Sequence, residues 1–156
     1  MFKYCIDSNV DNWKEKKSVF NERIIRKKKL VFLIEEEDGE KFGYYLNTEV
    51  IEQYDCGYLK TDNKSFEFNL ESNGRLNHSM KFEIKDSEVS GFILFVKSDD
   101  NMIYLRNIML WKENKKKQSH CRQNEDRFDY HGIEKALCGK ERWNHPFTPK
   151  EYLLFK

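Results

Sequence analysis

The stretch LVFLIEEEDGEKFGYYL, residues 30–46, decides the fold of this chain. Its first five residues, 30–34, are apolar without interruption, Asp38-Gly39 offers a turn, and the aromatic-rich segment 42–46 follows. Asp-Gly between two such segments is the strongest short-range signal for a β-hairpin, because glycine accepts a positive φ. The stretch therefore predicts two antiparallel strands joined by a tight turn.

Further strands are expected on both sides of this hairpin, at residues 2–6, 66–70, 80–84, 92–96, 102–105 with 108–111, and 152–155. Residues 66–70 (FEFNL) alternate apolar and polar side chains, as in a strand that turns one face to the core. Residues 92–96 are apolar throughout, which favours a central strand buried on both faces. One helix is expected within 18–28, where Phe20 and Ile24 lie one turn apart.

This pattern predicts an α+β fold of mostly antiparallel strands, arranged as a two-sheet β-sandwich flanked by short helices. A chain of 156 residues has room for a single domain over 1–156 with a core of its own. Aromatic residues make up 15% of the sequence, and the area that each of them buries argues against disorder.

The charge balance argues against a nucleic-acid binder. Lys and Arg number 28 against 27 Asp and Glu, a net charge of +1, whereas phosphate binding usually draws on a basic surplus. The longest apolar run, 91–96, is six residues, far short of the roughly 18 that a membrane-spanning helix needs. The first residues lack the apolar stretch of a secretory signal. We therefore expect an intracellular, cytoplasmic protein with no nucleic-acid partner and no membrane span.

Histidine and cysteine side chains gather late in the chain, at His120, Cys121, His131, Cys138 and His145. Structural zinc usually needs a tight pair of ligands two to four residues apart, but here the side chains are either adjacent or separated by six or more residues. We therefore expect no metal. We also expect no cofactor, because glycine-rich phosphate-binding motifs are missing. Without a secretory signal, the four cysteines are expected to be reduced thiols.

One enzymatic alternative stays open from the residue types alone. Cys121 or Cys138 could act as a thiolate nucleophile, with His131 or His120 as its base. Such a pair would suit a thiol-dependent peroxide-scavenging enzyme. The spacing of these residues does not by itself bring them together.

A basic segment, 112–117 (KENKKK), follows an apolar strand that ends at Trp111. Aromatic and cationic side chains are groups that protein interfaces reuse. Trp111, Lys112, Lys115, Lys116 and Lys117 therefore form a candidate partner-binding surface. A solvated loop without a partner is the alternative for this segment.

Four parts of the chain resemble the TLDc domain, the module of eukaryotic oxidation-resistance and nuclear-receptor-coactivator-like proteins, in the divergent form found in amoebozoan parasites. They are 6–11 with 18–22, the hairpin 30–46, the F-x-F-x-L strand 66–70, and the tail segments 128–130, 136–140 and 147–150. The chain departs from the animal members at 101–105, where their glycine-rich turn before an F-G-[LI] strand is missing.

The resemblance implies two antiparallel sheets packed as a sandwich and flanked by helices, with no agreed catalytic residues. Members of that family are associated with protection from oxidative stress and with binding the V-type proton-pumping ATPase, whose assembly they regulate. We therefore expect a non-enzymatic intracellular protein-interaction domain, with subunits of the V-type ATPase as candidate partners.

Overall fold

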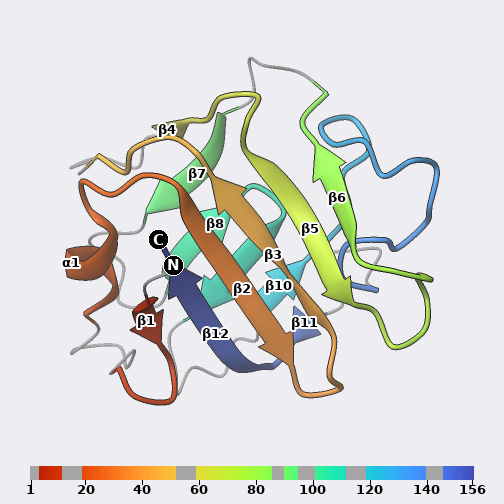
Figure 1. The fold of residues 1–156 in the computed structure, drawn as a ribbon, viewed down its shortest axis with the longest axis horizontal. Coiled ribbons are helices and arrows are strands. Elements are labelled where there is room, and N and C mark those ends of the chain that lie inside the picture. Colours follow the sequence, from red (N-terminus) through yellow and green to blue (C-terminus); the bar gives the residue numbers. More distant parts are fainter. Residues whose placement is uncertain are drawn as a thin grey trace.

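The fold is described from a computed structural model of the chain, which describes residues 4–11, 19–51, 59–85, 90–94, 101–111, 119–139 and 146–156. Mostly antiparallel strands form two sheets in a sandwich-like α+β arrangement, which confirms the expected fold class. Figure 1 shows the first sheet in front of the second, with the short helix beside one edge. No helix in these described ranges is long and apolar enough to cross a membrane.

The first sheet has six strands, in the order β1 (Tyr4–Asp7), β12 (Pro149–Phe155), β2 (Leu30–Glu36), β3 (Lys41–Leu46), β5 (Phe66–Glu71) and β6 (Met80–Glu83). The second sheet also has six, in the order β11 (Pro146–Phe147), β10 (Ser119–Cys121), β9 (Ile108–Trp111), β8 (Asn101–Leu105), β7 (Ser90–Leu94) and β4 (Leu59–Lys60). Helix α1 covers Phe20–Ile24.

The expected hairpin is confirmed as the centre of the first sheet. Strands β2 and β3 pair from Leu30 opposite Leu46 to Glu35 opposite Lys41. Gly39 has a φ of +93° at the turn, a conformation that glycine adopts without steric cost. The hairpin therefore forms from the local signals that the sequence carries.

The core lies between the two sheets. The inward side chains of β2 and β3, among them Phe32, Ile34 and Phe42, are buried, as are Ile103 and Leu110 of the second sheet. Removing large apolar side chains from water stabilises such a sandwich by roughly 25 cal/mol per Å² buried.

The helix is shorter than the expected 18–28 but buries the expected residues. Phe20 and Ile24 are both buried. The ring of Phe20 packs with its centroid 6.5 Å from that of Phe32 and 6.3 Å from that of Tyr152. Strand β7 lies between β8 and β4 inside its sheet, as expected for a central strand. The expected burial of 92–96 on both faces falls on side chains outside the described ones.

Candidate binding groove

Strand β5 turns its polar side chains inward and its apolar side chains outward. Glu67 and Asn69 lie between the sheets with exposed fractions of 0% and 1%, whereas Leu70 is 49% exposed on the outer face. Apolar and polar side chains therefore alternate along 66–70, but the polar side chains face the core and the apolar side chains face outward. This is the reverse of an amphipathic strand that packs its apolar side on the core. The physical reason is that both polar side chains find hydrogen-bond partners inside the sandwich.

Cross-strand pairing extends this outward apolar face over neighbouring strands. One row across the sheet runs through Phe155, Val31, Tyr45 and Phe66, and the next runs through Leu153, Leu33, Gly43 and Phe68. These rows form a groove of about 480 Å³ on the outer face of the first sheet. Figure 1 shows the backbone of this sheet with that face turned to the viewer. The lining of the groove is Val31, Leu33, Tyr45, Phe66, Phe68, Leu70, Ser79, Met80, Lys81 and Phe155. We call it the sheet-face groove.

Gly43 lies under the groove, beneath the ring of Phe68. A Cβ at this position would lie 1.9 Å from the carbonyl oxygen of Phe32 and 2.7 Å from Cζ of Phe68. No side chain fits there without moving backbone. The ring of Phe68 therefore lies over residue 43. The centre of the outer face is thus formed by an aromatic ring that lies close to the backbone of the sheet.

The groove has an apolar centre and a charged rim. The rings of Tyr45 and Phe66 lie 4.9 Å apart between centroids. On the β6 side, Nζ of Lys81 lies 4.6 Å from the centroid of Phe66 and 3.0 Å from Oε1 of Glu83. An apolar centre inside a polar rim is the usual anatomy of a protein interface.

A second set of charges borders the groove along β12, β2 and β3. Glu35 forms ion pairs with Lys150 and Lys41. The pKa of the Glu35 carboxyl is lowered, chiefly by its hydrogen bond with Lys150. Charged side chains thus flank the apolar rows at two places.

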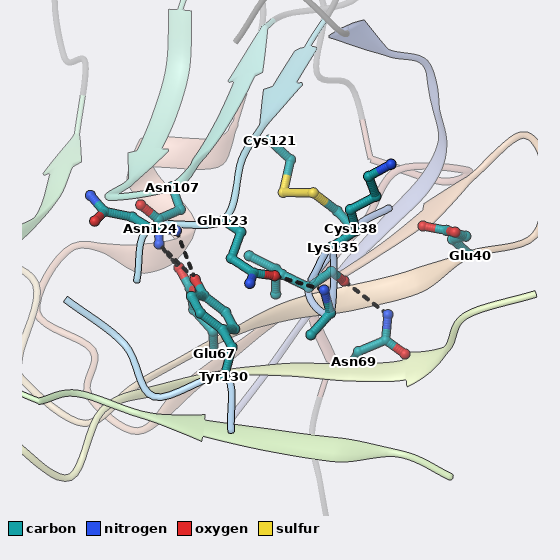
Figure 2. The surroundings of a disulfide bond; sticks show 12 residues. Glu40, Glu67, Asn69, Asn107, Cys121, Gln123, Asn124, Tyr130, Lys135 and Cys138 are labelled. Carbon is teal, nitrogen blue, oxygen red and sulfur yellow. Dashed lines mark hydrogen bonds between the residues drawn. A yellow bond between two sulfur atoms is a disulfide. The ribbon is translucent and has the colours of Figure 1, made fainter. Parts of the chain in front are cut away.

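A buried hydrogen-bonded cluster lies under the groove, on the inner face of β5. Oε1 of Glu67 accepts a hydrogen bond from Nδ2 of Asn107 at 2.8 Å, and Oε2 accepts one from Oη of Tyr130 at 2.5 Å. Figure 2 shows these side chains meeting from β5, from the turn after β8 and from the segment 122–139. Burial raises the pKa of Glu67 to about 8, against the lowering effect of its hydrogen bonds to Tyr130 and Asn107.

The segment 122–139 is held against β5 by further bonds. Nδ2 of Asn69 donates to the carbonyl oxygen of Leu137 at 2.8 Å. Cys121, at the end of β10, forms a disulfide with Cys138, drawn in yellow in Figure 2. Arg75 pairs with Glu40 at 2.9 Å and donates to the carbonyl oxygen of Lys135. Segment 122–139 therefore fixes which face of β5 points outward.

The disulfide corrects the expectation of reduced thiols for this pair. Both cysteines are buried and their sulfur atoms are bonded to each other, whereas a reactive cysteine is a partly exposed thiolate. His131 is exposed; its Nδ1 lies 3.7 Å from Asp129 and its ring packs beside Phe82. A thiol reaction at Cys121 or Cys138 would first require reduction of the disulfide. Among the residues that the structure describes, no three His, Cys, Asp or Glu side chains gather as a metal site.

The candidate surface around Trp111 is only partly described. Trp111 ends β9 in the second sheet, is half-buried, and its backbone N–H donates to Oγ of Ser119 at 3.2 Å. Lys112, Lys115, Lys116 and Lys117 lie outside the described residues. Trp111 is therefore on a different sheet from the groove.

The groove was not among the features predicted from the sequence, although the sequence carries one signal for it. In a sheet with one face in water, the outward positions of β2 would be polar. Instead Val31 and Leu33 are apolar and half-buried on the outer face. No protein-family model and no curated protein matches the chain. The functional proposal therefore rests on the geometry of the groove and on the resemblance described above.

Proposed function

We propose that this chain is a non-enzymatic protein-interaction domain that binds its partner in the sheet-face groove. The observation that carries this proposal is the reversed sense of β5, which turns Phe66, Phe68 and Leu70 to the outer face while Glu67 faces the core. Among these three, Leu70 is exposed, Phe66 is half-buried and Phe68 is 8% exposed. Apolar surface left in water costs about 25 cal/mol per Å² relative to burial. An apolar centre inside a polar rim is typical of an interaction site.

The polar groups at the groove favour binding over catalysis. Oη of Tyr45 donates to Oδ1 of Asn47 at 3.2 Å, and Lys81 is paired with Glu83 at 3.0 Å. The lining residues include no cysteine or histidine, so within this groove no thiolate or imidazole is available as a nucleophile or base.

The resemblance to TLDc domains supplies the partner in this proposal, a subunit of the V-type ATPase, and with it a cytoplasmic role in the response to oxidative stress. Trp111 and the basic segment 112–117 remain a proposed second contact region. Trp111 lies on the second sheet and the groove on the first, so the proposal treats them as two separate contact regions.

Affinity capture tests the proposal. The tagged chain is used to capture V-type ATPase subunits from a lysate of its source cells, and the subunits are quantified by mass spectrometry. Leu70→Asp places a carboxylate that must be desolvated in the interface, so we expect capture to fall about tenfold or more, a change of about 1.4 kcal/mol. Ile51→Asp is the matched control, because Ile51 is 52% exposed against 49% for Leu70 and is not part of the groove.

The outcomes separate the parts of the proposal. Equal capture by the wild type and Leu70→Asp would overturn the groove as the contact surface. A wild type that retains no V-type ATPase subunit would overturn the partner. Charge reversal of Lys115, Lys116 and Lys117 to Glu tests the second region in the same assay, and unchanged capture would remove it.

A further inference from the structure

We infer that the occupant of the sheet-face groove is an amphipathic α-helix of the partner protein, laid across β2, β3 and β5. This inference rests on the proposed function and goes beyond it by naming the kind of segment that binds. It follows from the backbone pairing of the sheet, the dimensions of the apolar face and the charges on its rim.

The backbone of the groove floor is already paired on both sides. Strand β2 pairs with β12 and β3, and β3 pairs with β2 and β5. An extended segment laid on this face would lose water from its own N–H and C=O groups and find no backbone partners. A helix satisfies these groups internally except at its ends. The face therefore selects a helix over an extended peptide.

The chain itself covers one end of the nearby sheet edge, where β6 ends. Ile84 forms an isolated bridge with Phe128 beyond the end of β6. The backbone N–H of Lys85 donates to the carbonyl oxygen of Arg127 at 2.8 Å, and that of Asp129 donates to Glu83 at 2.9 Å. Segment 127–129 therefore covers the C-terminal end of β6 and shortens the edge that is open to a partner strand.

The apolar face has the width of a helix. From Phe66 to Leu70 on β5 is about 14 Å at roughly 3.4 Å per residue, and an α-helix with its side chains is about 10–12 Å across. A single acyl chain is narrower and would leave part of this face in water. The apolar rows cross from β12 to β5, three strand spacings of about 4.8 Å each, which corresponds to about 10 residues of helix.

The rim charge indicates where a polar contact of the helix lies. Lys81 is half-exposed at the groove edge, where its ammonium is held over the ring of Phe66 at 4.6 Å. Lys81 is also paired with Glu83 at 3.0 Å, in an exposed ion pair of the kind that is weak in water, so a carboxylate of the partner would share this cation with Glu83 at the β6 end of the groove. The helix that fits therefore has apolar residues every three or four positions and an acidic residue near the end that lies on β6.

Site-specific photocrosslinking of the full chain tests this inference. p-Benzoylphenylalanine replaces Leu33 or Leu70 in the groove, and replaces Ile51 as the control outside it. Leu33 and Leu70 lie two strands apart, about 10 Å at the usual spacing. We expect both probes to label one helical segment of a captured subunit, at positions about six or seven residues apart, and the probe at 51 to leave that segment unlabelled.

Other labelling patterns overturn the inference. Crosslinks to a segment with period-two alternation, to a lipid acyl chain or to a second copy of this chain would each contradict a helix in the groove. Absence of crosslinks from 33 and 70, while V-type ATPase subunits are still captured, would also contradict it. Labelling of a helix in a protein other than the V-type ATPase would leave the inference intact and overturn the proposed partner.

A charge exchange tests the polar contact separately. We expect Lys81→Glu to lower capture about tenfold and Lys81→Arg to keep it within about twofold, because arginine retains the cation. Equal capture by Lys81→Glu and the wild type would overturn the acidic contact.

Discussion

Tyr130 donates a hydrogen bond from its Oη to Oε2 of Glu67 over 2.5 Å, and so joins two residues that are 63 positions apart in the chain. Glu67 is fully buried on the inner face of β5. Because successive side chains of a strand point to opposite faces, this inward position of Glu67 turns Phe66 and Phe68 outward into the groove. The buried hydrogen bond and the apolar outer face are therefore two consequences of one strand orientation.

The first prediction concerns the pH dependence of stability. Burial raises the pKa of Glu67 in the folded chain from about 4.5 to about 8. Between these values the folded state holds a proton that the unfolded state has lost, so the free energy of unfolding falls as pH rises, by up to about 1.4 kcal/mol per pH unit. Above the folded pKa this contribution is flat. Urea unfolding from pH 5 to pH 9 should show this fall in the wild type and a smaller fall in Glu67→Gln. Equal pH slopes in the two proteins would contradict it.

The second prediction concerns the hydroxyl of Tyr130. Tyr130→Phe removes the donor to Oε2 of Glu67 and leaves this buried oxygen without it, which should lower the free energy of unfolding by about 1–3 kcal/mol. Tyr45→Phe is the control, because its hydroxyl bonds to Asn47 in a partly buried position and its loss should cost less than about 1 kcal/mol. Chemical denaturation of both variants measures the difference. A cost for Tyr130→Phe no larger than for Tyr45→Phe would argue against the buried network.

The third prediction concerns the floor of the groove. Gly43→Ala would place a Cβ 1.9 Å from the backbone oxygen of Phe32, so we expect a loss of about 3 kcal/mol or more, at the upper end of overpacking costs. Gly74→Ala has nothing within 4 Å of its Cβ and only a φ of +80° to accommodate, which should cost about 1–2 kcal/mol. Thermal unfolding compares the two. Similar melting temperatures would show that β2 and β3 shift easily at this point.

The fourth prediction concerns the disulfide. Cys121 and Cys138 are separated by 17 positions, and closing a loop of this size stabilises a fold by about 3 kcal/mol in the chain-entropy account. A reducing agent should therefore lower the melting temperature of the wild type. The double variant Cys121→Ser/Cys138→Ser should have a low melting temperature both with and without the reducing agent. A wild-type melting temperature that is the same with and without the reducing agent would contradict this prediction.

The hairpin and the fold class were predictable because their causes are local. Asp38-Gly39 favours the turn whatever surrounds it, and the apolar residues of 30–34 demand a buried environment. The short helix was placed around Phe20 and Ile24 for the same reason, although α1 ends at Ile24 rather than at 28. Local propensity places such elements well and their ends less well.

The groove was not predictable because it depends on which residues of neighbouring strands lie opposite one another in the sheet. Val31 and Leu33 are apolar at outward positions, but only the pairing of β2 with β3 and β12 aligns them with Tyr45 and Phe155. The disulfide escaped prediction in the same way. The spacing of Cys121 and Cys138 carries no signal, and the path of segment 122–139 brings them together.

The sequence by itself determined which residues alternate, where the chain turns and that two antiparallel sheets enclose a core, because periodicity and turn chemistry act between near neighbours. The tertiary structure alone decided which side of β5 faces that core. Periodicity states only that Phe66 and Phe68 share one face and Glu67 and Asn69 the other. The choice between the faces was made by partners far along the chain, Asn107, Tyr130 and the carbonyl of Leu137, because a buried polar group is stable only where hydrogen-bond partners are already in place.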